Sequence, residues 1–324
     1  AGGDVYFDVA SFKEYGKLAK RNNLEEDYSI SRIDETTEKR NKGDFCLWKF
    51  SKPGEPFWKT DIGAGKPGWH IEDTAITEKE LGTQYDVHGG GLDLIFPHHE
   101  AEIAQIESIT GKKPFVKYWM HTGFLQVNKE KMSKSLGNFS TIKDILKIYN
   151  KNTIRFLFLS SHYKKPLDFS KESLDQAKNS LQRLNEIMIK LNSYKSKAKD
   201  YTKLNFIIKK AELDFETAMD DDFETANAIT TIFNFTKIIN KLLTEEKLSQ
   251  KNIKKVKDFM KGIDKIFGIL EETNISKKIK DLVNKREKTR KQKDFKTSDK
   301  LREEIKSLGY YVDDTKEGPV IKKL

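Results

Sequence analysis

The stretch from residue 85 to residue 102, YDVHGGGLDLIFPHHEAE, decides the fold of the first half of the chain. Residues Tyr85–His88 have the composition of a short strand, and the three glycines that follow predict a tight turn. A helix is expected to resume near Pro97, because proline is tolerated in the first helical turn. A strand, a glycine loop and a helix in this order are typical of an open α/β sheet, in which ligands bind beyond the carboxyl ends of the strands.

Outward from this stretch, the sequence changes character along the chain. From Val5 to about Leu159, short apolar runs alternate with glycine, proline and short helical patterns, which is typical of an α/β fold. After about Pro166 the apolar residues recur at three- and four-residue intervals and predict an all-α helical bundle. A short strand or hairpin is expected after Gly309. The residues that set the helical period are Leu174, Ala177, Leu181, Leu184, Met188 and Leu191, and then Ile253, Val256, Met260, Ile263 and Phe267.

Composition bounds the classes of function. The chain has 324 residues, a formal net charge of +10 and a pI near 9.2, which indicates either a polyanionic partner such as nucleic acid or only a lysine-rich surface. The single cysteine, Cys46, permits no internal disulfide and is typical of a reducing compartment, so a cytoplasmic location is expected. No apolar run approaches the roughly 20 residues that span a bilayer, and no membrane role is expected.

Residues 131–135, KMSKS, form a basic loop next to Gly137. Lysine ammonium groups on a flexible loop act as mobile point charges that can follow the phosphates of a triphosphate through a transition state. A basic run of five residues is more often a solvated turn. Here every letter resembles the second signature motif of class I aminoacyl-tRNA synthetases, after a predicted strand. Lys131 and Lys134 are therefore the candidate catalytic residues, and Lys134 is also the candidate ATP contact.

The glycine run before this loop is a second candidate site. Gly89 and Gly91 would let a ligand approach the backbone closely, and the Asp93 carboxylate could accept hydrogen bonds from ribose hydroxyls. Alone, the glycines could form an ordinary turn. Their place between a strand and a helix favours an ATP-binding loop.

Two metal-ligand candidates, His98 and Glu102, stand four residues apart and are expected on one helix face. An imidazole and a carboxylate at that spacing suit zinc. The alternative is an ordinary helix N-terminus, in which Glu100 and Glu102 interact with the helix dipole and the histidines are only packed. Spacing alone favours this alternative, so a metal site needs further ligands.

Taken together, these segments resemble the cysteinyl-tRNA synthetases from the first residue nearly to the last. The resemblance implies an enzyme, a monomer or homodimer, that uses ATP with Mg²⁺ to activate L-cysteine as the adenylate and transfers it to tRNA(Cys). It also implies one zinc ion per complete subunit, which selects cysteine over serine, with His98 and Glu102 among its ligands and Trp69 closing the amino-acid pocket beside His98. The matching segments are residues 65–72, 88–93, 96–102, 118–121, 129–138 and 218–223.

The same resemblance divides the chain into parts. Residues 1–62 correspond to the remainder of a connective insertion, 63–165 to the C-terminal half of a Rossmann-like catalytic domain, 166–272 to a tRNA-binding helical bundle, and 273–324 to an anticodon-recognition region. The family's first signature, a His-Ile-Gly-His-like motif, and a further zinc cysteine do not occur in these residues, and the chain starts without methionine. The chain is therefore expected to be a fragment, or one half of a split gene, that does not catalyse adenylation alone.

Asp73 is the clearest departure from the family. Its members commonly have a cysteine zinc ligand four residues after the pocket tryptophan, where this chain has Asp73. An aspartate oxygen can bind zinc at roughly 2.0 to 2.2 Å, although oxygen is a harder ligand than sulfur and the affinity is expected to fall. Two interpretations remain equally open: Asp73 is a ligand, or it is an outer acceptor or a solvated helix residue.

The C-terminal part distinguishes the candidate functions. Arg290, Phe295, Asp299 and Asp314 resemble the family's anticodon-reading region, and such side chains suit stacking on unpaired bases and hydrogen bonding to them. Taken singly, each is more typical of an ordinary residue in a helical tail. Their joint order favours a cysteine–tRNA ligase over two alternatives: a non-catalytic tRNA-binding paralogue, and a cysteine ligase of the mycothiol pathway that acts on a small amine.

Overall fold

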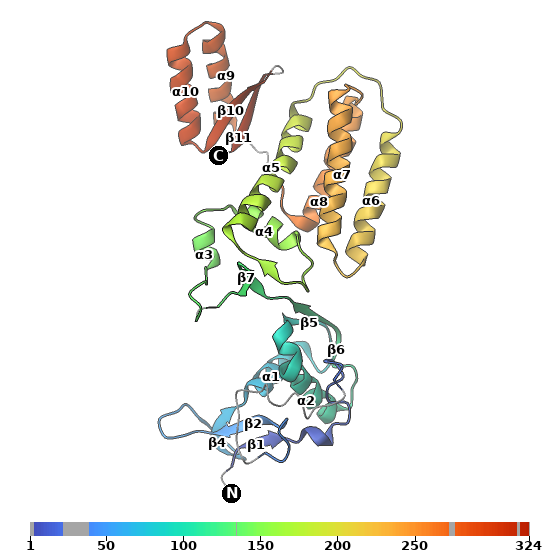
Figure 1. The fold of residues 1–324 in the computed structure, drawn as a ribbon, viewed down its shortest axis with the longest axis vertical. Helices are drawn as coiled ribbons and strands as arrows, with labels where there is room; N and C mark the ends of the chain where they lie inside the picture. Colours follow the sequence, from blue (N-terminus) through green and yellow to red (C-terminus); the bar gives the residue numbers. More distant parts are fainter. Residues whose placement is uncertain (1–2, 22–38, 134, 272–275, 316–317, 324) are drawn as a thin grey trace. The chain divides into compact units, whose positions relative to one another are not determined.

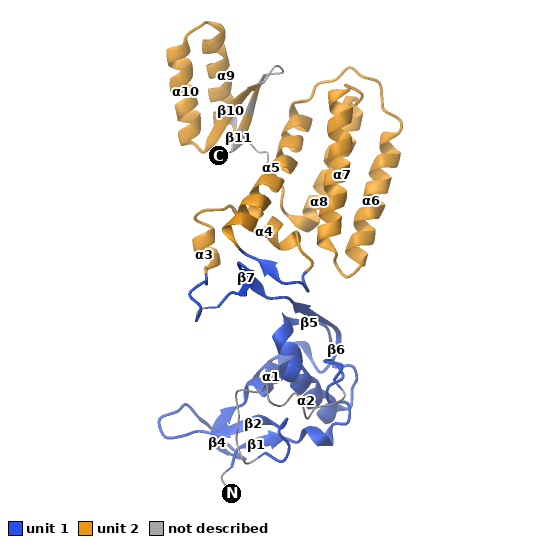
Figure 2. Ribbon diagram, in the orientation of Figure 1, with its two compact units in different colours: residues 1–139, 163–169 blue, residues 140–162, 170–324 orange. Residues whose placement is uncertain are grey.

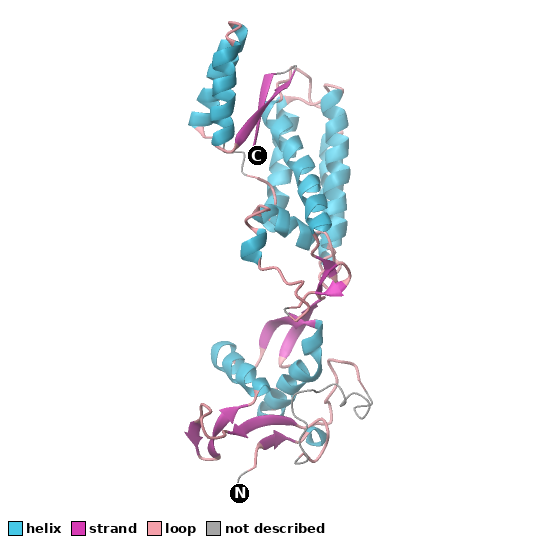
Figure 3. Cartoon of the chain, turned by 60° about the vertical axis from the view of Figure 1, so that its left-hand side comes forward, coloured by secondary structure: helices cyan, strands magenta, loops and turns pink. Residues whose placement is uncertain are grey.

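The computed structural model describes residues 3–21, 39–133, 135–271, 276–315 and 318–323. The chain divides into two compact units, coloured blue and orange in Figure 2: residues 1–139 with 163–169, and residues 140–162 with 170–324. Most strands of the described residues belong to the first unit, whereas the second unit is mostly helical (Figure 3). The predicted order, an α/β part followed by a helical part, is confirmed.

The first unit starts with an antiparallel sheet of strand order β1-β2-β4-β3, of which Figure 1 labels β1, β2 and β4. Cys46 is buried in this sheet, as its strand-like surroundings predict. Gly68, directly after the last strand of this sheet, lies so close to Cys46 that a Cβ on it would be 2.0 Å from the Cys46 carbonyl oxygen. The elements are β1 (Val5–Phe7), β2 (Phe45–Phe50), β3 (Trp58–Thr60) and β4 (Gly63–Pro67), followed by α1 (Trp69–Leu81).

A β-α-β unit carries the decisive stretch. Strands β5 (Tyr85–Gly91) and β6 (Val116–Thr122) pair in parallel, and α2 (Glu100–Thr110) provides the crossover that parallel strands need. In their register, residues 89–91 pair with residues 120–122. The predicted tight glycine turn is therefore wrong, because the neighbouring strand satisfies the backbone groups of the glycines and overrides their turn preference.

The helix expected near Pro97 begins later than predicted. Residues Ile95–His99 form an irregular turn, in which Phe96 has extended backbone angles (φ −136°, ψ 132°). The regular helix starts at Glu100. His98 consequently lies just before α2, within reach of its first turn.

The strand predicted from Tyr118 to Val127 is two strands. The strand is interrupted at residues 123 and 124, and a Cβ at Gly123 would lie 2.3 Å from the carbonyl oxygen of Lys165. After this interruption, β7 (Leu125–Val127) joins a small sheet with strands β8 (Glu130–Lys131) and β9 (Leu167–Asp168). The signature loop starts directly from β8.

The second unit contains the predicted helical bundle. Every residue that sets the apolar period in α5 and α8 is buried, which confirms the sequence pattern. A leucine such as Leu184, 0% exposed, stabilises the bundle by about 2 kcal/mol through burial of apolar surface. The helices are α3 (Ile142–Ile145), α4 (Lys151–Leu159), α5 (Lys171–Ser193), α6 (Leu204–Asp220), α7 (Thr225–Thr244) and α8 (Gln250–Phe267).

The C-terminal tail has a small core of its own. Two helices, α9 (Lys277–Lys291) and α10 (Phe295–Ser307), are followed by an antiparallel hairpin of β10 (Tyr310–Thr315) and β11 (Gly318–Lys323), the second of the two expected alternatives (Figure 1). The buried residues of this core are Ile279, Leu282, Val283, Ile305 and Val312. Among the described residues of the whole chain, no helix is both long and apolar enough to cross a bilayer.

Candidate functional site

Three buried glutamates on α2 differ in how their charge is satisfied. Glu100 accepts hydrogen bonds from two backbone N–H groups at 2.7 and 3.0 Å. Glu107 accepts one backbone hydrogen bond at 3.1 Å and contacts the Lys17 ammonium. Glu102 is 0% exposed, and neither of its oxygens accepts a hydrogen bond. A buried carboxylate without donors is strongly destabilising unless a cation balances its charge, so Glu102 has the environment of a cation ligand.

Asp73, His98 and Glu102 converge on one point. Nε2 of His98 lies 2.8 Å from Oδ2 of Asp73 and 3.0 Å from Oε1 of Glu102, although the second contact lacks hydrogen-bond geometry. One ligand atom of each residue lies within 4.8 Å of the others. The structure thus brings together the three residues predicted as metal ligands. An imidazole and two carboxylates are donors that zinc accepts.

The surroundings of His98 connect this group to the predicted amino-acid pocket. Burial disfavours its charged form, but the carboxylates of Glu102 and Asp73 outweigh burial, and the pKa of His98 is raised. A bound metal would have to displace that proton, since only neutral imidazole is a ligand. The His98 ring also stacks on Trp69, with centroids 4.5 Å apart. Trp69 is 50% exposed, so it can cover a small molecule at His98.

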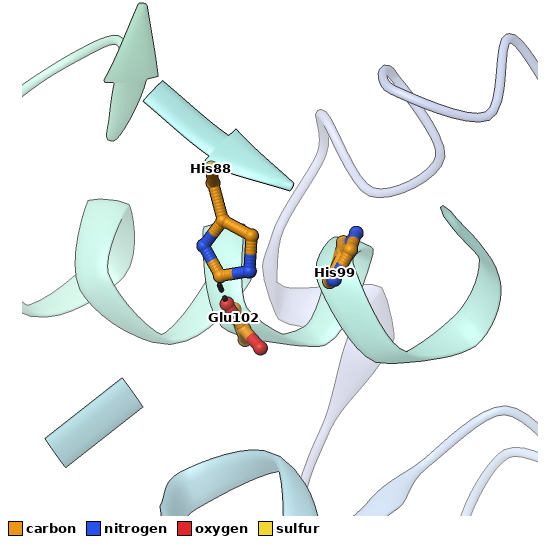
Figure 4. A group of neighbouring side chains, drawn as sticks. All are labelled: His88, His99 and Glu102. Atoms are coloured by element: carbon orange, nitrogen blue, oxygen red, sulfur yellow. Dashed lines mark ion pairs between the residues drawn. The ribbon is translucent and has the colours of Figure 1, made fainter. Parts of the chain in front are cut away.

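A second possible ligand group shares Glu102. Figure 4 shows His88 beside Glu102, with His99 nearby; Nδ1 of His88 lies 3.8 Å from Oε2 of Glu102. The two oxygens of Glu102 therefore face different histidines. His99 contacts Nε2 of His121 through its Nδ1 at 2.8 Å. Burial and then the neighbouring histidines lower the pKa of His99 to about 3, which leaves its ring neutral.

The predicted nucleotide loop and the signature loop meet. Nζ of Lys131 lies 3.6 Å from Oδ2 of Asp93 and 3.8 Å from the ring centroid of Phe124. A Cβ at Gly91 would lie 2.5 Å from Oδ1 of Asp93. At Gly89 the nearest atom to such a Cβ is 3.6 Å away, so the protein itself leaves room there. The other predicted catalytic lysine, Lys134, lies outside the described residues.

Comparison with known proteins identifies the family. Residues 1–179 match the family described as tRNA synthetases class I (C) catalytic domain, and residues 214–271 match the DALR domain. Proteins named cysteine–tRNA ligase are 45% identical in Thermococcus gammatolerans, 46% in Thermococcus kodakarensis and 44% in Methanococcus maripaludis. Each match covers 99% of this chain and 70% of the relative. The chain belongs to the cysteine–tRNA ligase family.

The evidence for membership of the cysteine–tRNA ligase family is the sequence identity to its members. A chain in the crystal structure of the ternary complex of Agrobacterium radiobacter K84 agnB2 LeuRS-tRNA-LeuAMS matches with a TM-score of 0.48 at 13% identity, over 64% of this chain and 30% of that chain. The ligase match, by contrast, extends through the helical bundle and the tail.

In this cysteine–tRNA ligase, the four tail residues predicted to contact tRNA are exposed or half-exposed. Nη1 of Arg290 lies 2.5 Å from Oδ2 of Asp314, and both side chains are 37% exposed. Phe295, 62% exposed, is the first residue of α10, and Asp299 is exposed on the same helix. The structure therefore brings Arg290 and Asp314 together and leaves an aromatic face available on α10.

The roles of four histidines around the candidate metal ligands were not predicted from the sequence. His70 contacts His98, with Nδ1 atoms 2.7 Å apart, His88 and His99 lie near the other oxygen of Glu102, and His121 contacts His99. All four of these histidines stood inside segments that were singled out, namely residues 65–72, 88–93, 96–102 and 118–121. Their role was not visible because the contacts join β5, β6 and α2, which are distant in sequence.

Proposed function

We propose that the chain contributes to a cytoplasmic cysteine–tRNA ligase, which selects cysteine with zinc held by Asp73, His98 and Glu102. The observation that carries the proposal is Glu102. Its carboxylate is fully buried without a hydrogen-bond donor, whereas two other buried glutamates of the same helix have donors. The family membership and the convergence of an imidazole with two carboxylates support the same assignment.

Zinc, when bound, would act as a Lewis acid that prefers thiolate sulfur to a hydroxyl oxygen, which distinguishes cysteine from serine. The chain's own residues cover the amino-acid pocket and bind ATP. Trp69 covers the amino-acid pocket, because its half-exposed ring lies against His98. Asp93 accepts hydrogen bonds from the ribose of ATP, and Lys131, beside it, neutralises phosphate charge that develops during transfer. Lys134 shares that role, and Gly89 allows close approach of the nucleotide.

We also propose that tRNA(Cys) binds through the helical bundle and the tail, with Arg290, Phe295, Asp299 and Asp314 contacting unpaired bases. The net charge of +10 supports a polyanionic partner. The exposed Phe295 ring is suited to base stacking, and the Arg290 guanidinium to hydrogen bonding at a base edge.

A second ligand set is favoured by one observation. Oε2 of Glu102 faces His88, and the neutral His99 ring nearby is in the protonation state that binds metal. Zinc held by His88, His99 and Glu102 would leave Asp73 as an outer acceptor for His98. The two sets therefore make opposite predictions for single variants.

Elemental analysis of the purified chain tests the assignment. We expect about one zinc ion per chain, lost in Glu102→Gln, His98→Ala and Asp73→Ala but retained in His88→Ala. The reverse pattern, with zinc lost in His88→Ala and retained in Asp73→Ala, assigns the metal to the second set. Glu100→Gln is the matched control, because Glu100 is equally buried on α2 but has its own donors. Full zinc content in Glu102→Gln refutes both sets.

A further inference from the structure

A buried arginine underlies the predicted tRNA-binding surface of the tail. The side chain of Arg286, on α9, is 3% exposed. Its Nη1 and Nη2 donate hydrogen bonds of 2.8 and 2.9 Å to Oδ1 and Oδ2 of Asp314, on β10. Arginine is almost never buried unless it is paired, and this two-pronged geometry is the most directional pairing that a carboxylate can have. The contact therefore joins the hairpin to α9 in one defined orientation.

The same carboxylate also holds Arg290. Nη1 of Arg290 lies 2.5 Å from Oδ2 of Asp314, and Arg286 and Arg290 both approach Oε1 of Glu287, at 3.1 and 3.6 Å. Arg290 follows Arg286 by four residues and so lies on the same face of α9. The network has two positive and two negative groups, and Arg286 is the member that is buried.

The hydrogen bonds of Arg286 to Asp314 are formed while another donor of the same guanidinium is left without a partner. Its Nε is buried without a hydrogen-bond partner, while both Nη atoms are paired. An exposed pair such as Arg290 with Asp314 is worth little alone and exchanges between rotamers. The two hydrogen bonds from Arg286 hold the Asp314 carboxylate in one rotamer. An ionised carboxylate has about four acceptor directions, and two go to Arg286 and one to Arg290, which leaves about one for a base.

We infer that Arg286 is a positioning residue for tRNA recognition: it fixes the Asp314 carboxylate and, through it, the Arg290 guanidinium, without touching RNA itself. The inference rests on the proposed base contacts of Arg290 and Asp314. Arg286 would therefore contribute to the choice between anticodon bases although its side chain is inaccessible to the RNA. Lysine at position 286 would keep the charge but not the fork, so it should lose orientation while retaining electrostatic attraction.

Fluorescence anisotropy with labelled tRNA(Cys), and with the same tRNA carrying one substituted anticodon base, tests the inference. We expect Arg286→Lys to lower the ratio of the two affinities about tenfold, the scale of one base contact, mainly by weakening binding of the cognate tRNA. Arg290→Ala should lower the ratio as well. The double variant should lose less than the sum of the two single losses, because both changes act on the network around Asp314.

Ile305→Val is the matched control for a structural effect. Ile305 is fully buried in the core of the tail, so its shortening should lower stability without changing the ratio. If Arg286→Lys lowers both affinities equally, or leaves the ratio unchanged while Arg290→Ala lowers it, the inference is overturned. An unchanged ratio in Arg290→Ala instead refutes the proposed base contact. Should circular dichroism show that Arg286→Lys unfolds the tail, Arg286→Met, which leaves no unpaired buried charge, replaces it in the same comparison.

Discussion

The three buried glutamates of α2 have different roles because their hydrogen-bond partners differ. Glu100, Glu102 and Glu107 are all buried on α2, yet two of them hold backbone segments in place and one has no donor. Glu100 and Glu102 both lie in the first turn of α2, as the dipole alternative expects, so the helix dipole does not distinguish them. The difference between the three carboxylates comes from what the fold places opposite each one.

Two glycines of β5, Gly89 and Gly90, differ in how much space surrounds them, and alanine substitutions at the two positions test this difference. A Cβ at Gly90 would lie 2.7 Å from the ring of His99, which is buried against His121. We expect Gly90→Ala to lower the free energy of unfolding by about 1 to 3 kcal/mol, because a packed ring must shift. Urea unfolding measures this change.

Gly89→Ala is the matched control in that experiment. Its Cβ would meet nothing closer than 3.6 Å, so its stability should stay close to that of the wild type. A weaker affinity for ATP with unchanged stability would agree with close approach of the nucleotide at Gly89. Equal losses of stability in the two variants would contradict the packing described at Gly90.

At the scale of elements, helix ends follow local rules in the bundle. Helix α8 starts at a capping box formed by Ser249 and Asn252 and ends at Gly268, which has a left-handed conformation (φ 60°). Both features satisfy backbone groups that a helix end leaves without partners. Gly262, inside the same helix, has no such role, because a Cβ there would meet nothing within 4 Å.

We therefore expect Gly262→Ala to raise the stability of the second unit by about 0.4 to 1 kcal/mol, since alanine restricts the unfolded chain at no steric cost. Gly268→Ala should have the opposite sign, because alanine disfavours a positive φ. Thermal unfolding followed by circular dichroism at 222 nm compares the two. The same sign for both variants would contradict the backbone description of α8.

The junction between α9 and β10 should be sensitive to acid. The hydrogen bonds from Arg286, and then its charge and that of Arg290, lower the pKa of Asp314 below its usual 3.8. A carboxyl group whose pKa is lowered on folding stabilises the fold fully above its unfolded pKa and loses that contribution as the pH falls through the folded value. The contribution should thus be intact at pH 5 and decline below about 3.8.

Hydrogen exchange of the β10 amides between pH 5 and pH 2.5 measures this decline, after correction for the intrinsic exchange rate. Asp314→Asn is the control, since it has no carboxyl group to titrate. Protection of β10 that falls equally in Asp314→Asn would assign the acid sensitivity to another group.

At the scale of the whole molecule, the predicted metal group and the predicted base contacts belong to different units. Asp73, His98 and Glu102 are in the first unit, whereas Arg290 and Asp314 are in the second. The tail in addition has its own buried core. The two functions should therefore be separable by deletion.

We expect a chain that ends at residue 275 to retain zinc but to bind tRNA(Cys) at least about tenfold more weakly, because it lacks the base contacts. Elemental analysis and fluorescence anisotropy measure the two properties on the same preparation. Loss of zinc together with tRNA binding would indicate that the tail supports the fold of the first unit instead of reading RNA.

The sequence by itself determined the class of fold, the helical bundle with its buried face, the hairpin of the tail and the family. Apolar periodicity and signature motifs are local, and local patterns survive without knowledge of the fold. Only the tertiary structure decided that the glycines 89–91 continue a strand, because the pairing partner β6 lies about 30 residues later. It likewise decided that Glu102 is buried without a donor and that Arg286 holds Asp314. Burial and pairing depend on which distant segments meet, and no spacing along the chain encodes that.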